Sequence, residues 1–260
     1  MIVFWALVLF EITVQTGKFE IIKDSIGALT SDRRMQALLI AFAFGAFIEG
    51  CAGFGTPVAV AAAMMVGLGF SAFYASTVCL LANTAPVAFG SIGIPVITLA
   101  GITGLPLDQL SASVGRICAP ISLFLPTYLI LVTSGLSATL EIWPAVLVSG
   151  ASFALFQFLV SNFIGPQLTD VIASLAAMGG LILLLRFWTP PNAGKIDSAR
   201  ESSSLTAVQA PASEDLILSG HRYTRGKLWS AWLPYGFLVL FVLAWGYQPI
   251  LVILDRKSVV

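Results

Sequence analysis

Two apolar stretches decide the fold of this chain: GAFIEGCAGFGTPVAVAAAMMVGLGF (residues 45–70) and CLLANTAPVAFGSIGIP (residues 79–95). Each is interrupted by glycine or proline next to hydrogen-bonding side chains. The first interruption, EGCAGFGTP, also carries a carboxylate, Glu49, and the second is the shorter segment ANTAP. Within a lipid bilayer such breaks are tolerated only where protein surrounds them or they line a wet cavity. They therefore mark the place where a binding site is expected.

The composition indicates a membrane protein. Hydrophobic residues make up 58% of the chain, charged residues only 10%, and the mean hydropathy is +0.94. Several apolar runs approach the ~20 residues that cross ~30 Å of hydrocarbon. Charged residues between positions 35 and 185 are few: Glu49, Asp108, Arg116, Glu141 and Asp170. We predict an all-α polytopic membrane protein with about seven to eight hydrophobic helical segments, including discontinuous helices and a possible re-entrant hairpin.

Several classes of function receive little support from the sequence. The formal net charge is zero, which argues against nucleic acid as a partner. Cys51, Cys79 and Cys118 are odd in number and widely spaced, which fits neither a disulfide framework nor a zinc site. The single histidine, His221, lies in a polar segment. We therefore expect no enzyme activity, no metal and no cofactor.

The hydrophobic segments form a single transmembrane transport domain over residues 1–260. A polar, mixed-charge loop at residues 189–228 lies within it. Residues 1–10 are apolar but lack the features of a signal peptide, so we expect a short or truncated span there. The other candidate segments are residues 35–70, 71–101, 117–132, 142–160, 168–188 and 229–254.

Basic residues predict the orientation. Residues 15–34 and the loop 189–228 hold most of the lysines and arginines, so both are expected to be cytoplasmic. The chain must then cross the membrane an even number of times between them. Residues 35–70 either form two short spans, giving six crossings, or dip in and out as a re-entrant hairpin, giving four. The two arms of thirteen residues each are short for crossing and slightly favour the hairpin.

The first break has the residues of an unwound stretch followed by a new helix. Gly50, Gly53 and Gly55 admit backbone conformations closed to other residues. Pro57 suits the first turn of a helix, where its missing N–H costs nothing. A helix that begins at Thr56 would present free N–H groups and partial positive charge. A small carboxylate is a natural ligand for such a helix end.

The second break repeats this pattern. Asn83 and Thr84 offer hydrogen-bonding side chains, and Pro86 is expected to open the next helix. Pairs of unwound segments in apolar sequence point to the binding sites of secondary transporters.

Two charged residues are candidates for the site. The ionised form of Glu49 is disfavoured away from water, so this carboxyl could exchange a proton and carry it; the alternative is a carboxyl that only fixes helix packing. Arg116 is the only basic residue between Arg34 and Arg186. Its guanidinium could grip a carboxylate through two hydrogen bonds, or it could extend to lipid headgroups at the interface.

Four other polar residues are assigned to loops. Asp108 and Glu141 are expected in short solvated loops. Asn162 and Asp170 flank a Gly165–Pro166 corner and are expected to cap that loop, with a role in the site as the less favoured alternative.

The segments FGAFIEGCAGFGTPVAVAAAMMVGLGF and CLLANTAPVAFGSIGIPVI resemble the lactate permease family. The resemblance continues through TGKFEIIKDSI before them and WPAVLVSGASFALFQFLVSNFIGPQL after them. It implies an all-helical carrier with broken helices in the bacterial inner membrane. Such carriers take up L-lactate, and often D-lactate and glycolate, with protons. The family segments match here at Glu49, Gly50, Gly53, Phe54, Gly55, Thr56 and Pro57, and at Asn83, Thr84, Ala85 and Pro86.

Members of that family are roughly twice as long as this chain, and their second half is expected to supply a second set of broken helices. The sequence is therefore interpreted as a fragment of such a carrier, with the missing half or a partner subunit as a possible partner.

The expected function is uptake of L-lactate and related 2-hydroxymonocarboxylates, coupled to protons. Glu49 would couple to protons, and the substrate would contact Gly53, Gly55, Thr56, Asn83, Thr84 and Arg116, with Gly50, Pro57 and Pro86 shaping the breaks. A Na⁺-coupled carrier of another organic anion is one alternative. A non-transporting half-length membrane subunit is another.

Overall fold

The computed structural model describes residues 32–53 and 55–190, together with isolated positions (12, 15–18, 21, 29, 30, 230, 233, 236 and 237). The described ranges are helical, without strands. Their elements are α3 (Arg33–Ala37), η1 (Leu38–Phe44), α4 (Gly45–Cys51), α5 (Thr56–Gly67), α6 (Ala72–Ala82), η2 (Val87–Phe89), α7 (Gly90–Thr103), α8 (Leu107–Ser134), α9 (Leu136–Glu141), α10 (Trp143–Phe163) and α11 (Thr169–Phe187).

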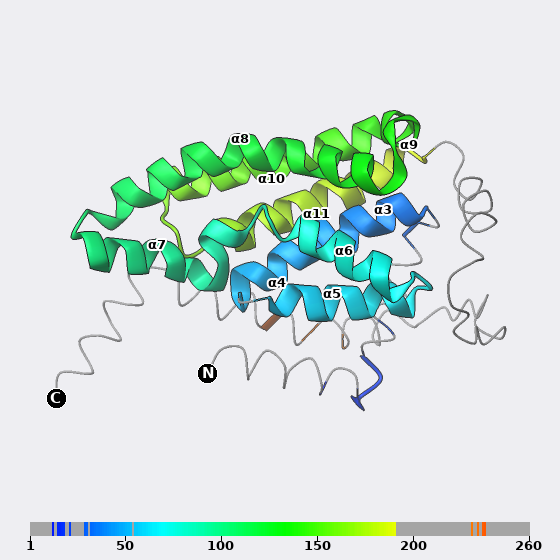
Figure 1. Cartoon of the computed structure of the whole chain (residues 1–260), viewed down its shortest axis with the longest axis horizontal. Coiled ribbons are helices and arrows are strands. Elements are labelled where there is room, and N and C mark those ends of the chain that lie inside the picture. Colours follow the sequence, from blue (N-terminus) through cyan, green and yellow to red (C-terminus); the bar gives the residue numbers. More distant parts are fainter. Residues whose placement is uncertain are drawn as a thin grey trace.

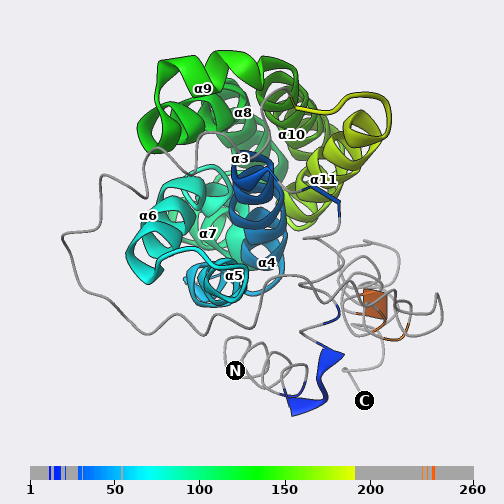
Figure 2. The same cartoon turned by 90° about the vertical axis from the view of Figure 1, so that its right-hand side faces the viewer.

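One continuous helical segment lies at the centre of the molecule. It is formed by α3, the π-helical η1 and α4, and it runs over Arg33–Cys51. An apolar window of this segment is fully buried, and Figure 2 shows it surrounded by α5–α8, α10 and α11. A helix that is hydrophobic on all sides either lies in a protein core or spans a membrane, and this one is enclosed by other helices. The Phe42 ring, for example, packs on Phe153 of α10 with ring centroids 5.2 Å apart.

Four helical segments are long and apolar enough to cross a membrane: Arg33–Cys51, α8, α10 and α11. The pair Ala72–Ala82 and Val87–Thr103 passes the same test together but is bent by 68°. These features confirm the predicted polytopic all-α class with discontinuous helices. The expected terminal spans at residues 1–10 and 229–254, the loop 189–228 and most of residues 15–34 lie outside the described residues.

The hairpin at residues 35–70 has unequal arms. The first arm is a 19-residue helix, longer than expected because the chain stays helical through Glu49 to Cys51. The second arm, α5, has only 12 residues and is about 18 Å long. Figure 1 shows α5 running back beside α4. Helix α7 extends along the long axis of the molecule, past the turn that joins α4 to α5. The choice between a re-entrant hairpin and two spans stays a prediction.

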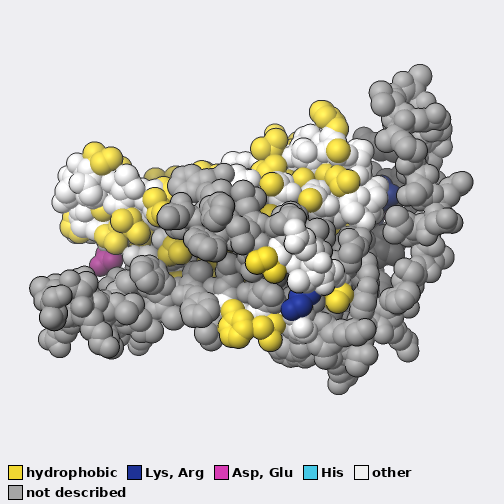
Figure 3. Space-filling view, turned by 90° about the horizontal axis from the view of Figure 1, so that it is seen from below, with side chains coloured by type: hydrophobic (Ala, Val, Ile, Leu, Met, Phe, Trp, Pro, Cys, Tyr) yellow, Lys and Arg dark blue, Asp and Glu magenta, His cyan; other side chains and the backbone are white. Residues whose placement is uncertain are grey.

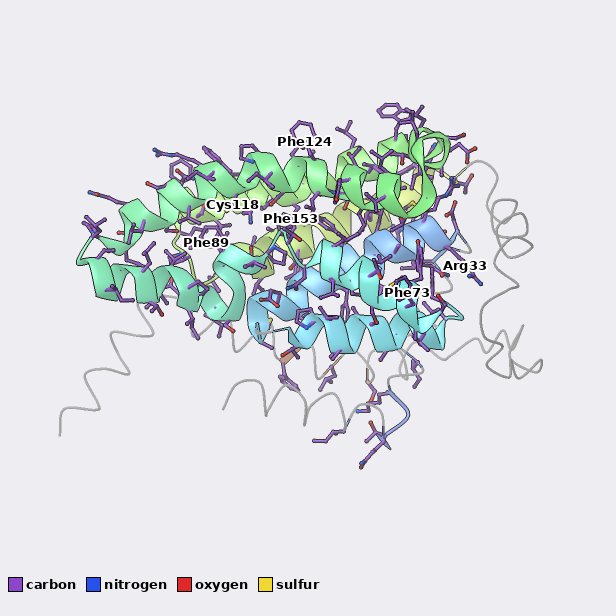
Figure 4. All side chains as sticks on the ribbon, in the orientation of Figure 1. Arg33, Phe73, Phe89, Cys118, Phe124 and Phe153 are labelled. Atoms are coloured by element: carbon purple, nitrogen blue, oxygen red, sulfur yellow. The ribbon has the colours of Figure 1, made fainter. Side chains whose placement is uncertain are left out.

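The outer surface is apolar, as a lipid-facing surface requires. Large side chains with high exposure include Phe73 (85%), Phe163 (78%) and Phe187 (89%). Figure 4 shows Phe73 on α6 and Phe124 on the outer side of α8. In the face drawn in Figure 3, the described side chains are mostly hydrophobic or uncharged, with few charged groups.

The first break is narrower than predicted and is tied to the second. Helix α4 ends at Cys51, Gly53 and Gly55 have φ angles of 64° and 79°, and α5 begins at Thr56. The Ser91 hydroxyl donates a hydrogen bond of 2.8 Å to the carbonyl oxygen of Ala52, the residue directly after α4. A Cβ on Gly53 would overlap the Ser91 hydroxyl. The two breaks can therefore meet only because residue 53 is glycine.

The second break is longer than the sequence pattern predicts. Pro86 does not open an α-helix, because the 3₁₀ turn η2 follows it. Ser91, Ile92 and Gly93 then form a left-handed turn with φ angles of 50°, 59° and 76°. Left-handed conformation costs a non-glycine residue roughly 1–2 kcal/mol. Regular α7 geometry begins only after Gly93.

A buried ion-pair network holds α3 to α9. Arg34 donates to Asp32 Oδ2 at 2.7 Å, to Glu141 Oε2 at 2.8 Å and to the Ala138 carbonyl oxygen at 3.1 Å. The expectation that Glu141 lies in a solvated loop is therefore wrong, because it ends α9 and meets Arg34. Asp108 is exposed, in the first turn of α8.

Replacement of Gly53 by alanine should destabilise the protein. The Gly53→Ala side chain meets both a left-handed backbone and the Ser91 hydroxyl, so we expect a loss of at least about 2 kcal/mol. Gly101→Ala is the matched control: this exposed α7 glycine has open space around its Cβ position. It should be neutral or slightly stabilising. Melting temperatures in detergent measure the difference, and equal effects of the two variants would contradict the close crossing.

Removal of the Arg34 guanidinium should also destabilise the protein. Arg34→Met leaves Asp32 and Glu141 without their shared partner, and breaking a buried pair of this kind costs about 3 kcal/mol. Arg186→Met on the exposed end of α11 is the matched control and should change the melting temperature little. A tolerated Arg34→Met would show that the network does not hold α3 to α9.

Candidate functional site

Glu49 lies where the two breaks meet. It occupies the last turn of α4 and is 5% exposed. Its carboxyl lies near the Gly55 backbone and the Asn83 side chain. A Cβ on Gly90 would stand 2.7 Å from Glu49 Oε1, so the carboxyl lies directly against the backbone of the second break. Both predicted interruptions therefore contribute to the surroundings of this one carboxyl.

Asp170 brings a second carboxyl to the same place. It lies in the first turn of α11 and is 1% exposed. A Cβ on Gly50 would stand 3.1 Å from the Asp170 Cβ, so α11 packs closely on the end of α4. Asp170 also interacts electrostatically with Glu49. The expectation that Asp170 caps a loop is therefore wrong, since it points into the protein interior beside Glu49.

Gln157 of α10 connects the second carboxyl to the second break. Its Nε2 donates to Asp170 Oδ1 at 3.5 Å and to the Ala85 carbonyl oxygen at 3.4 Å, both long contacts. Sequence reasoning missed this residue. Its signal was the single amide in the apolar run SFALFQFLV, because a polar side chain inside a membrane helix is costly unless it has a role.

We call these residues the oxygen cluster: Glu49, Thr56, Asn83, Gln157 and Asp170. One buried oxygen atom of each has no hydrogen-bond partner among the described residues, namely Glu49 Oε2, Thr56 Oγ1, Asn83 Oδ1, Gln157 Oε1 and Asp170 Oδ2. Leaving a buried polar atom unpaired costs roughly 1–3 kcal/mol. Five such atoms around one pair of breaks indicate a place that binds something.

The start of α5 differs from the predicted anion site. The backbone N–H of Thr56 donates to the Gly53 carbonyl at 3.1 Å, and that of Val58 donates to the Gly55 carbonyl at 3.2 Å. Pro57 has no N–H. These three positions therefore offer no free amide, and the Thr56 hydroxyl is the group that lacks a partner. Gly55 and Thr84 are exposed beside the oxygen cluster.

Arg116 is joined to a different residue. It is exposed on α8, and its Nε donates to Asn162 Oδ1 at 2.9 Å. Asn162 lies within α10 and donates to the Phe158 carbonyl at 2.8 Å, so it does not cap the following loop as expected. Among the described residues, Arg116 forms no hydrogen bond or ion pair with the oxygen cluster. Within the described part of the chain, His, Cys, Asp and Glu form no group of three that could hold a metal ion.

The comparison with protein families gives one match, to the family model described as L-lactate permease, over residues 1–260. The chain is 48% identical over 251 residues to the L-lactate permease of Bacillus subtilis (strain 168), covering 96% of this chain and 43% of that protein.

Two Escherichia coli (strain K12) proteins are also similar. Glycolate permease GlcA is 41% identical over 244 residues, covering 94% of this chain and 43% of that protein. The L-lactate permease is 41% identical over 248 residues, covering 95% of this chain and 43% of that protein.

No solved structure matches the chain. The chain spans less than half the length of these curated relatives, yet nearly all of it aligns with each of them. The family model covers every residue, including both breaks and the carboxyls of Glu49 and Asp170. On this evidence the chain is a multi-pass membrane protein, and it belongs to the L-lactate permease family.

Proposed function

We propose that this chain forms part of a secondary carrier that takes up L-lactate and related 2-hydroxymonocarboxylates, such as D-lactate and glycolate, together with protons. Family membership and the similarity to L-lactate and glycolate permeases support a small carboxylate as substrate. Because the chain spans 43% of those relatives, the activity is proposed for the chain together with the rest of such a carrier. The proposed location is the bacterial inner membrane, with residues 15–34 and 189–228 cytoplasmic.

The observation that carries the proposal is the position of Glu49. It is a buried carboxyl that lies against both breaks, and one of its oxygens has no partner among the described residues. The ionised form of a carboxyl held away from water is disfavoured, so such a group can hold a proton and release it when its surroundings change. Glu49 would therefore take up a proton as the substrate binds and release it as the substrate leaves.

The substrate would bind beside Glu49 through side chains and exposed backbone of the breaks. Thr56 and Asn83 each have an unpaired buried oxygen, and Thr84 has an exposed hydroxyl. These groups suit the 2-hydroxyl of a hydroxy acid, which can both donate and accept. The exposed backbone at Gly55 lies next to them, and Gly53, Gly50, Pro57 and Pro86 shape the two breaks.

The substrate carboxylate requires a donor or a cation. Arg116 is the proposed residue on α8, because its bond to Asn162 uses Nε and the two terminal nitrogens could receive a carboxylate side by side. This role needs the substrate, or a part of the carrier outside this chain, to bridge between Arg116 and the oxygen cluster.

Two alternative functions remain, and each is supported by one observation. Unpaired oxygens from carboxyl, amide and hydroxyl groups also suit Na⁺, which favours a Na⁺-coupled carrier of another organic anion. The short coverage of the relatives favours a half-length membrane subunit that does not transport by itself.

Uptake of labelled L-lactate into membrane vesicles tests the proposal. Vesicles would carry this chain alone or together with the remaining part of a relative. We expect accumulation that follows an inward proton gradient, stops with a protonophore and does not need Na⁺. Uptake that requires Na⁺, or no uptake with either set of vesicles, would contradict the proposal.

Glu49→Gln should abolish accumulation driven by the proton gradient, because the amide cannot exchange a proton. Exchange of labelled for unlabelled L-lactate should persist, since the side chain keeps its size and polarity. Asp108→Asn is the matched control, as Asp108 is exposed at the start of α8. Full gradient-driven accumulation by Glu49→Gln would remove Glu49 from the coupling step.

A further inference from the structure

A second buried carboxyl stands next to the proposed proton carrier and has no role in the function described so far. We propose that Glu49 and Asp170 act as one proton-holding pair, with Asn83 and Gln157 as its amide partners, so that Asp170 is a second residue of the coupling step. This inference rests on the proposed function and deepens it.

The charge balance around the pair supports this assignment. Asp170 is 1% exposed, Glu49 is 5% exposed, and they interact electrostatically. No lysine or arginine of the described residues is among the groups that interact with either carboxyl. Two interacting carboxylates that are both ionised, away from water and without a cation, repel each other. The pair therefore keeps at least one proton while the site is empty.

The other charged or titratable groups on the packed elements do not balance the pair. From α8, the Cys118 thiol interacts with Asp170, and it brings no positive charge. Arg116, also on α8, is exposed and bonded to Asn162. Arg34, at the far end of the central helix, is bonded to Asp32 and Glu141.

The hydrogen bonding of the oxygen cluster points to the same conclusion. Of its five unpaired oxygens, those of Asn83 and Gln157 can only accept, as can those of the two carboxyls when they are ionised. Among these five atoms the Thr56 hydroxyl is the one that can donate, so acceptors outnumber donors. A proton on a carboxyl turns an acceptor into a donor. Glu49 could then donate to the amide oxygen of Asn83, and Asp170 to that of Gln157.

The pair also touches both breaks, which links its proton content to substrate binding. Glu49 is within reach of the Gly55 backbone in the first break. Gln157 joins Asp170 to the Ala85 carbonyl in the second. When a proton leaves, Asn83 and Gln157 lose their donor and the carboxyls gain charge. The side chains proposed to hold the substrate are therefore rearranged by the same event.

Infrared difference spectroscopy on the purified chain tests the pair without any transport measurement. At neutral pH we expect a carbonyl stretch from a protonated carboxyl. The stretch should weaken or shift in Glu49→Gln and in Asp170→Asn, disappear in the double variant, and stay in Asp108→Asn. It should not respond to Na⁺. Absence of the band at neutral pH, or its loss on adding Na⁺, would overturn the proposal, and the second result would show that the oxygen cluster binds a cation.

Transport measurements then test the role of Asp170. Asp170→Asn should reduce proton-driven accumulation of L-lactate at least tenfold and change its pH profile, while exchange of labelled for unlabelled L-lactate persists. The double variant should lose no more accumulation than either single variant. If the two carboxyls act as one unit, the effects of removing each of them do not add. Melting temperatures in detergent show that the variants fold.

The two proposals fail in different ways. Wild-type vesicles that do not take up L-lactate with protons contradict the proposed function. Wild-type uptake with protons, together with unchanged accumulation and pH profile in Asp170→Asn, contradicts only the pair.

Discussion

The structure depends on the need to satisfy polar groups of an unwound backbone where no water is available. At the end of α4 the helix stops and leaves carbonyl oxygens that lipid cannot bind. The Ser91 hydroxyl from the second break serves the Ala52 carbonyl of the first. The second break thus supplies a donor that the first break lacks, and the candidate site lies where the two breaks meet. This explains why neither interruption stands alone in the sequence.

Close approach of three chain segments follows from this crossing. The start of α11 packs directly against Gly50. Ser91 packs against Gly53, and the Glu49 carboxyl packs against Gly90. At each of these positions a side chain would occupy the space of the neighbouring segment. The same contacts bring Glu49 and Asp170, which lie on helices far apart in the sequence, into one interior. The chemistry of the site is therefore a consequence of packing that only glycine permits.

The class of fold and the position of the first break follow from the sequence, because apolar length and glycine–proline spacing are local properties. The second break was misplaced: Pro86 suggested a helix start, but a 3₁₀ turn and a left-handed turn at Ser91–Gly93 come first. Nothing local predicts that turn, since it is held by the approach of Pro166 and of the first break. Gln157 was missed, and a site role for Asp170 was the less favoured interpretation, because only tertiary packing brings Asp170 beside Glu49 and Gln157 beside Asp170. Glu141 was misjudged because its partner, Arg34, is over one hundred residues away.

The Arg34 network fixes one end of the central helix, and the carboxyl pair lies near its other end. A helix of 19 residues is about 28 Å long, so a tilt of about 5° around the fixed end would move the other end by about 2 Å. That displacement is comparable to the difference between a hydrogen bond and no contact. A rotation of the helix Arg33–Cys51 by this amount about Arg34 would therefore be enough to open or close the contacts of Glu49.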